Sequence, residues 1–366
     1  MSKTLRNRLA ISGIGTVCPG AVGREALVRA LSAGRKAEAP CRVPEFGLEE
    51  YLENARSFRR VAGVTKYALA AMALAITDAG FAAGAFGGER VGLIVGITHC
   101  AVTYSVQFHR TLVLEGPLVA SPLLFSESVP NAPAGNGAIA FRIRGPVHTL
   151  IGEEPVGTQA IDLAAVLLHG GLVDRCLVVG AEEWNEVVAH AYGQVDRAAR
   201  RKRDSDEAPP LSEGAAALVV ELESAAARRG AFPHAVISGW SLGRCLAEPM
   251  EDTTGEVVRQ AFRPTAHGPA EADHVLLPTG RFRQATSRGV VVARGQAAGP
   301  PAWIDLLPLV GNPAGASNLL EVAASAALIS TGRMQGPGLA LSTGIEGTLS
   351  AVVLSRAELG AASGGT

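Results

Sequence analysis

Two neighbouring carboxylates, Glu153 and Glu154, stand at the turn of a strand–turn–helix pattern. The aliphatic run at residues 149–151 predicts a strand, Gly152 predicts a turn, and residues 158–168 predict a buried helix. In such an elbow the turn residue points its side chain into the space above the sheet, and the N–H groups that begin the helix face the same way. A carboxylate there can act as a general acid or base, but it cannot hold an acyl group as a thioester.

The motifs around this elbow carry a resemblance to a known family. They are Gly145-Pro146 before the strand, Gly157 after the turn, and Gly-Leu-Val-Asp followed by Val-Val-Gly-Ala-Glu-Glu within residues 171–183. Together they resemble a β-ketoacyl synthase of the thiolase superfamily. In that family the elbow carries the catalytic cysteine, and counting from Gly145 places Glu154 at the cysteine position.

The resemblance also locates the two histidines that an active condensing enzyme carries. One belongs to a His-Gly-Thr-Gly turn, and the matching segment here reads Leu-Leu-Pro-Thr-Gly at residues 276–280. This match places Leu277 at the histidine, or Pro278 if the register shifts. The other histidine belongs to a Gly-His turn before a helix, where this chain has Asn312 and lacks the lysine that usually precedes the turn.

Condensation requires all three of these groups. A nucleophile accepts the acyl group from a thioester, and two imidazoles assist decarboxylation and stabilise the enolate. Leucine and proline side chains have no donor, and asparagine can donate a hydrogen bond but cannot shuttle a proton. We therefore expect no catalytic residue for condensation, because the family positions hold Glu154, Leu277 or Pro278, and Asn312.

A further segment lies where the family has a glycine-rich loop gated by phenylalanines. Residues 342–348 have Thr343 and Ile345 at the phenylalanine positions, and Glu346 replaces a glycine. A second carboxylate close to Glu154 would raise the pKa of one or both, or find a cation in a second subunit. Alternatively, Glu346 points to solvent. The expected pocket residues are Glu153, Glu154, Asn312, Ile345 and Glu346.

The remaining pattern predicts the elements that hold these positions. Apolar strands are expected within residues 8–20, 90–96, 172–183 and 210–221, with a buried alanine-rich helix at 64–80. A second unit repeats the theme, with strands at 235–239, 274–277, 338–342 and 349–354 and helices at 252–262 and 318–332. Two similar halves, 1–225 and 226–366, predict a thiolase-like α/β fold: a five-layered αβαβα duplication with parallel sheets covered on both faces.

The composition argues against several classes of protein. The chain has 366 residues and 48% hydrophobic content, which is enough for a large buried core. Its formal net charge of -1 gives no field to attract nucleic acid or an anionic membrane. Its five cysteines lack the spacing of a disulfide framework or a metal site. No targeting segment or run of ~20 apolar residues is evident, so we expect a soluble cytoplasmic protein.

Three other patterns have plain structural interpretations. Gly13 and Gly15 follow a strand but lack the third glycine of a dinucleotide fingerprint. His99 and Cys100 have no third polar group nearby in sequence, which favours a loop. Residues 196–210 contain a basic run and an acidic run. The basic half could bind a phosphopantetheine carrier, but a solvated loop is the favoured interpretation.

The resemblance leaves three hypotheses for function. The first is a non-catalytic partner of an active ketosynthase, similar to the chain-length factor of type II polyketide or fatty-acid-like biosynthesis, although those factors usually carry glutamine at the elbow. The second is an enzyme of altered chemistry that uses Glu154 in hydrolysis or decarboxylation. The third is a scaffold that binds a carrier protein. We favour the first, because a partner subunit tolerates the loss of every catalytic group at once.

The favoured hypothesis implies particular partners. Residues 129–141 resemble the stretch at which two subunits of the family pack, and their apolar character suits a large interface. We therefore expect a dimer, and we favour a heterodimer with an active ketosynthase subunit. We expect no bound cofactor. The phosphopantetheine arm of an acyl carrier protein would enter this pocket or that of the partner subunit.

Overall fold

The strands of the first half of the chain form one mixed arrangement. The computed structural model describes residues 8–36, 41–82, 84–200, 209–246, 249–295 and 299–357. Strand β3 lies between β4 and β5 and is parallel to both, whereas β6 runs antiparallel to β5 and β1. The strands are β1 (Leu9–Cys18), β3 (Val91–Ile97), β4 (Val147–Ile151), β5 (Arg175–Glu182) and β6 (Gly214–Leu222), in the order β4-β3-β5-β6-β1.

The second half repeats this arrangement strand for strand. Strand β8 is parallel to β9 and β10, and β11 runs antiparallel to β10 and β7. These strands are β7 (Ala235–Arg244), β8 (His274–Leu277), β9 (Ala302–Asp305), β10 (Gly338–Thr343) and β11 (Thr348–Ser355), in the order β9-β8-β10-β11-β7. The repeated pairing is what a duplication would produce, although the boundary near residue 225 stays a prediction.

The two halves are joined at the start of β1. Residues Leu9, Ala10 and Ile11 pair with β7 as well as with β6, so the strands form one hydrogen-bonded path. A short strand, β2 (Ala21–Val22), pairs with β1 beside this path. The expectation of wholly parallel sheets is therefore wrong. A buried apolar run predicts a strand covered on both faces, but it does not reveal the direction of the neighbouring strands.

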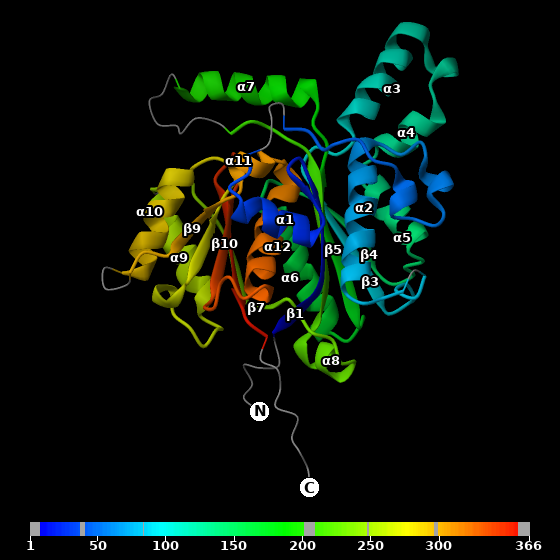
Figure 1. The fold of residues 1–366 in the computed structure, drawn as a ribbon. Coiled ribbons are helices and arrows are strands. Elements are labelled where there is room, and N and C mark those ends of the chain that lie inside the picture. Colours follow the sequence, from blue (N-terminus) through cyan, green and yellow to red (C-terminus); the bar gives the residue numbers. More distant parts are fainter. Residues whose placement is uncertain are drawn as a thin grey trace.

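Helices separate the strands into the predicted five layers (Figure 1). Helices α6 (Val156–His169) and α12 (Ser317–Ser330) lie between the two sets of strands, and almost all of α12 is buried. Helices α2 (Gly63–Asp78) and α5 (Ala132–Ala140) cover the outer face of the first half. On the second half, α9 (Met250–Phe262) packs on β7 and β11, and α10 (Arg283–Arg294) packs on α9. The αβαβα prediction is confirmed.

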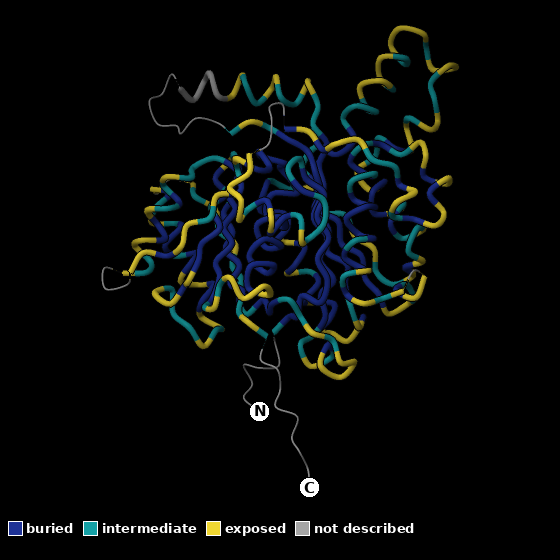
Figure 2. Tube along the Cα trace, viewed as in Figure 1, coloured by how far each residue is buried: buried dark blue, intermediate teal, exposed yellow. Residues whose placement is uncertain are grey.

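Small residues allow the layers to approach closely. A Cβ atom at Gly15 of β1 would lie 2.0 Å from the carbonyl oxygen of Ala71 in α2, which is shorter than any ordinary contact. The alanine-rich face of α2 therefore lies directly on the strands. Buried apolar side chains form three clusters, one on the outer side of each half and one around α6 and α12, and the core stands out as dark blue in Figure 2.

Several helices lie outside this layered core. Helix α7 continues to Arg200, so the first residues of the charged run at 196–210 are helical rather than a loop, and residues 201–208 lie outside the described part. Within the described ranges, no helix is long and apolar enough to cross a membrane. The helices not yet placed are α1 (Arg24–Ser32), α3 (Val102–Glu115), α4 (Pro122–Ser128), α7 (Glu186–Arg200), α8 (Glu223–Arg228) and α11 (Leu307–Val310).

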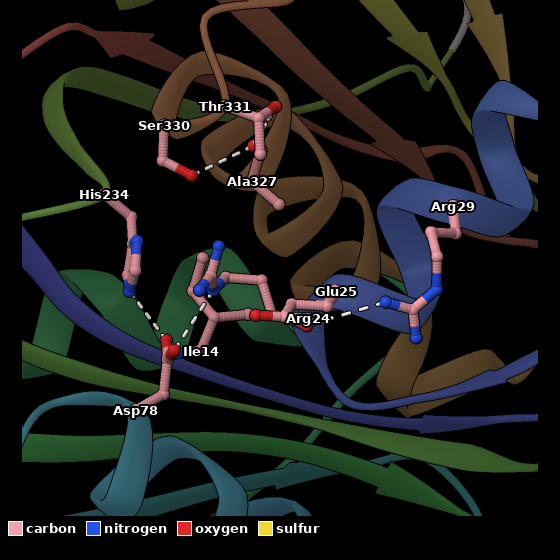
Figure 3. A network of polar contacts seen from close by, with 9 residues as sticks. All are labelled: Ile14, Arg24, Glu25, Arg29, Asp78, His234, Ala327, Ser330 and Thr331. Atoms are coloured by element: carbon pink, nitrogen blue, oxygen red, sulfur yellow. Dashed lines mark hydrogen bonds and ion pairs between the residues drawn. The ribbon is translucent and has the colours of Figure 1, made fainter.

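A polar network ties several elements together where the halves meet (Figure 3). The carboxylate of Asp78, the last residue of α2, accepts hydrogen bonds from the Ile14 N–H at 2.9 Å and from Arg24 Nε at 3.1 Å. His234, just before β7, forms an ion pair with Asp78 at 2.6 Å. Burial alone would raise the pKa of Asp78, but His234, Ile14 and Arg24 together hold that pKa below its ordinary value.

Replacement of Asp78 by asparagine should lower the free energy of unfolding by about 2 kcal/mol, because Arg24 and His234 lose their shared anion. A lowered pKa means that this stabilisation is present above the unfolded-state pKa, at about pH 4, and is lost as the pH falls through the lowered value. Urea denaturation at neutral and acidic pH measures the loss.

The matched control for this variant is Arg29→Ala. It breaks the exposed Arg29–Glu25 ion pair on α1, which is also drawn in Figure 3. Such surface pairs contribute less than about 0.5 kcal/mol. Equal losses for the two variants would show that the Asp78 network does not stabilise the joint.

Candidate functional site

The elbow between β4 and α6 is formed as the motif predicts. The N–H of Gly152 donates to the carbonyl of Ile97 at 3.0 Å, and the N–H of Val156 donates to the carbonyl of Glu153 at 2.8 Å. These bonds turn the chain sharply from the end of β4 into α6. They place Glu154 within the turn, where its residue is only 2% exposed.

The buried carboxyl of Glu154 has one identified partner. Its Oε1 accepts a hydrogen bond from Asn312 Nδ2 at 3.2 Å, whereas no hydrogen-bond partner is found for its Oε2 among the described residues. Burial raises the pKa of Glu154, and the neighbouring Glu153 adds to this effect. The backbone N–H of Glu154 and the hydrogen bond from Asn312 lower the pKa, but the effect of burial is larger. The neutral acid is therefore favoured more than in an exposed glutamate.

Asn312 is held in place from several sides. Its Oδ1 accepts from the Ala314 N–H and from the Ser317 hydroxyl, both at 3.0 Å. Its backbone bonds to Pro210 and Ser212, which precede β6. The amide group is thus fixed with its NH₂ toward Glu154, so the structure brings together the residues expected at the cysteine position and at the second histidine position.

The first histidine position lies next to another buried carboxyl. Leu277 is half-buried and Pro278 is buried, and neither side chain can donate a proton. The next residue, Thr279, donates its N–H to Oε1 of Glu321 at 2.9 Å. Glu321 is fully buried in α12, and burial raises its pKa well above the ordinary value. Sequence reasoning missed Glu321, although a single glutamate in an otherwise apolar helix was the available signal.

The residues of the 342–348 segment divide between the elbow and the surface. Oε1 of Glu153 accepts from the Glu346 N–H at 2.8 Å, and the Thr348 hydroxyl bonds to the other oxygen. The Glu346 side chain is exposed and pairs with Arg244 of the same chain at 2.9 Å. Ile345 is half-buried. Of the two alternatives for Glu346, a pocket beside Glu154 or the solvent, the structure therefore has the second, and the cation that pairs with Glu346 comes from the same chain.

Three further side chains near Glu154 were not recognised from the sequence. His99, after β3, forms a 3.5 Å contact with Glu182, and its ring lies edge-to-face with Tyr192 of α7 at 5.4 Å between centroids. Burial and then the charge of Glu154 raise the pKa of Tyr192. Arg281 is close enough to interact electrostatically with both Tyr192 and Glu154. These residues come from distant segments, so sequence spacing could not show their proximity.

The remaining candidate nucleophile in this region is unreactive. Cys100 is buried beside His99, and burial raises its pKa to about 12. A thiol with such a pKa is almost entirely protonated at neutral pH and is a poor nucleophile. Among the residues that the structure describes, no group of three or more His, Cys, Asp or Glu side chains is arranged to hold a metal ion. The site therefore offers a protonatable carboxyl and neutral hydrogen-bonding groups.

Replacement of Glu154 by glutamine should reduce the loss of stability that accompanies rising pH. Because the pKa of Glu154 is raised, the parent protein is most stabilised below the unfolded-state pKa, at about pH 4, and loses that stabilisation as the pH rises through the raised value. Glutamine keeps the shape and the acceptor for Asn312 but cannot ionise. Urea midpoints between about pH 4 and about pH 8 measure the difference. Parallel curves would contradict a raised pKa at Glu154.

A family model and a curated relative match the chain. Residues 48–226 match the model described as the N-terminal domain of β-ketoacyl synthase. A protein of Streptomyces rimosus, named as an oxytetracycline polyketide putative β-ketoacyl synthase 1, is 26% identical over 368 aligned residues, which cover 89% of this chain and 85% of that protein. The family model covers the elbow and most of the first half, whereas the match to the relative covers most of the chain.

Solved structures of ketosynthases have the same fold as this chain. One is described as the ishigamide ketosynthase/chain length factor, with a TM-score of 0.83 and 19% identity, covering 96% of this chain and 99% of that chain. Another is a type II polyketide synthase acyl-carrier protein in complex with its ketosynthase, with a TM-score of 0.79 and 18% identity, covering 96% and 99%. With the elbow and the repeated strand order, these results identify a β-ketoacyl synthase N-terminal domain at residues 48–226 and a thiolase-like ketosynthase fold over most of the chain.

Proposed function

We propose that this ketosynthase-like chain is a non-catalytic subunit that pairs with an active ketosynthase in type II polyketide or fatty-acid-like biosynthesis, in the manner of a chain-length factor. The observation that carries the proposal is the buried Glu154 at the elbow, hydrogen-bonded to a fixed Asn312. This pair occupies the place where a condensing enzyme needs a nucleophile and an imidazole.

The chemistry of the site supports a non-catalytic role. A carboxyl with a raised pKa does not form a stable thioester, and the Asn312 amide has no proton to transfer at neutral pH. The turn at Leu277 and Pro278 supplies no side-chain donor for an enolate oxygen. Loss of a single group could reflect a changed mechanism, whereas the absence of all three leaves condensation to a partner.

The named relatives also support the proposal. The Streptomyces rimosus protein is named for polyketide synthesis, and one structural neighbour is described as a ketosynthase/chain length factor. Another neighbour is a ketosynthase in complex with an acyl-carrier protein. We therefore propose the same classes of partner for this chain: an active ketosynthase, and an acyl carrier protein whose phosphopantetheine arm delivers the acyl group.

An exposed apolar surface supports pairing with a second subunit. Among the described strands, β4 pairs with β3 alone, which leaves the other edge of β4 available for a partner. Ile151 on β4 is 64% exposed, and Val147 and the nearby Ile139 of α5 are also exposed. Apolar side chains along an open strand edge favour association with another chain.

The same surface continues onto α3 and α4, which project from the body of the molecule in Figure 1. Helix α4 contacts α3 and α5, and α5 contacts β4, so the projection and the strand edge are connected. Monomeric proteins rarely expose so much contiguous apolar surface, and obligate interfaces are rich in it. The exposed apolar side chains of this projection include Val106, Val113, Leu118, Val119, Leu123 and Phe125.

A second function, an enzyme of altered chemistry, is favoured by the side chains that gather near Glu154. His99, Tyr192 and Arg281 could assist proton transfer in hydrolysis or decarboxylation. It ranks below the first because Glu154 is almost completely covered. Incubation of the chain alone with malonyl carrier protein distinguishes the two, since release of carbon dioxide that disappears in Glu154→Gln would favour the enzyme. The third hypothesis, a carrier-binding scaffold, requires no release of carbon dioxide in this experiment.

The interface proposal predicts that Ile151→Glu prevents stable pairing. A charge on the open edge of β4 would have to be buried in the interface, so affinity for the ketosynthase should fall by at least about tenfold, or about 1.4 kcal/mol. Co-expression with the ketosynthase encoded beside this gene, followed by size-exclusion chromatography, measures the pairing. Val187→Glu is the control, because Val187 is similarly exposed and belongs to α7, a helix that lies apart from β4 in Figure 1. Unchanged co-elution of Ile151→Glu would exclude this surface.

The loss of catalytic groups predicts that Glu154→Cys does not restore condensation. A thiol at the elbow could be acylated, but Leu277 or Pro278 and Asn312 provide no imidazole for decarboxylation. The variant is incubated with acyl and malonyl carrier proteins without a partner, and products are identified by mass spectrometry. Acylated protein without a β-ketoacyl product is expected. Condensation at the rate of an ordinary ketosynthase would refute the non-catalytic assignment.

A further inference from the structure

Glu154 is more deeply covered than an elbow residue that receives a ligand should be. An elbow projects its residue into the space above the strands, where a substrate must reach it. Here Glu154 is only 2% exposed, although residues 186–195 of α7 are exposed or half-buried (Figure 2). The cover over Glu154 is therefore a local feature, and it comes from particular side chains.

Tyr192 is the side chain of α7 that reaches this site. Its ring lies edge-to-face with that of His99, whose imidazole is itself held at Glu182. The nearby carboxylates of Glu154, Glu182 and Glu153 all influence the ionisation of its phenol, which requires the hydroxyl to lie close to them. Tyr192 is thus inserted between α7 and the elbow, and His99 supports it from the side.

The surroundings of Tyr192 show that its position is specific. Arg281, which follows the turn at residues 276–280, interacts electrostatically with both the phenol and Glu154. The neighbours of Tyr192 on the same helix, Ala191 and Gln194, are exposed, as is Val187. A half-buried tyrosine among exposed residues of the same helix, with its ring against His99, acts as an anchor of that helix.

We propose that Tyr192 closes the pocket above Glu154, so that this subunit excludes a phosphopantetheine-linked acyl chain from its own elbow. This inference rests on the proposed function and adds to it: the arm of the carrier protein is directed to the pocket of the active partner. The ring of Tyr192 packs against His99 beside the elbow, and the amide of Asn312 holds the Glu154 carboxyl from α12's side of the site. Access to Glu154 then requires α7 to move away.

The test uses a thiol at position 154 as a reporter of access. Glu154→Cys is treated with pantetheine bearing a terminal bromoacetamide, and alkylation of the peptide that spans position 154 is followed by mass spectrometry. Reading that peptide alone separates the reporter from the five native cysteines. In the presence of Tyr192 the reaction should be slow. Addition of Tyr192→Ala should accelerate it by about tenfold or more, since reactivity follows the fraction of molecules with an open pocket.

Two matched variants sharpen the result. Tyr192→Phe keeps the ring and should remain slow, because the ring rather than the hydroxyl fills the space. Val187→Ala truncates an exposed residue about 140° around the same helix and should leave the rate unchanged. If Tyr192→Ala does not fold, as judged by circular dichroism, Tyr192→Leu also removes the ring and answers the same question.

The closure is overturned if the position-154 thiol reacts as fast with Tyr192 in place as without it. It is also overturned if Val187→Ala accelerates the reaction equally, because α7 as a whole would then be loose. Either result leaves the pairing with a ketosynthase intact, since co-elution does not depend on access to Glu154. Conversely, if the chain does not co-elute with a ketosynthase but alkylation at position 154 is faster without the Tyr192 ring, the proposed partner function is rejected and the closure is retained.

Discussion

The close approach of α6 and α12 at Gly157 is the constraint on which the site depends. A Cβ atom at this position would lie 2.8 Å from Asn318 Oδ1 and 2.8 Å from Leu319 Cγ, so only glycine permits this packing. The adjacent Thr158 hydroxyl donates to Asn318 Oδ1 at 2.7 Å and fixes the two helices in register. Because Glu154 precedes α6 and Asn312 precedes α12, this contact between the helices determines the distance between the two side chains.

The central layer also explains how the fold accommodates buried acids. Glu154 and Glu321 both lie where water is excluded, and an isolated ionised carboxylate there would be strongly destabilising. Each receives a fixed donor, from Asn312 Nδ2 in one case and from the Thr279 N–H in the other, and each has a raised pKa. The thiolase-like fold of this chain therefore holds two buried acids, each beside its own fixed hydrogen-bond donor.

Much of the framework could be predicted from the sequence because buried elements carry long apolar runs. The elbow, the alanine-rich helix at residues 64–80 and the strands of both halves follow from such runs. Strand direction did not follow, since a strand covered on both faces has the same composition whether its neighbours are parallel or antiparallel. Helices α3 and α7 were not predicted from the sequence, because they lack a long buried apolar run. Their apolar side chains face outward or are scattered.

The candidate site could be predicted only where a motif fixed the positions. Glu154 and Asn312 were paired by their places in two family motifs, and they do form a hydrogen bond. Glu346 was assigned to the pocket by the same reasoning, but its side chain turns away to Arg244. Tyr192 and His99 belong to segments that no motif connects with the elbow, and only the folded chain brings them together.

The central claim is that this chain supports condensation without performing it. The most direct measurement is a reconstitution with acyl and malonyl carrier proteins in which the β-ketoacyl products of this chain alone, of the neighbouring ketosynthase alone and of the pair are compared by mass spectrometry. No product is expected from this chain alone, and the pair should give more product or a different chain length than the ketosynthase alone. Product formed by this chain alone at a rate comparable to that of the ketosynthase would contradict the proposed non-catalytic role.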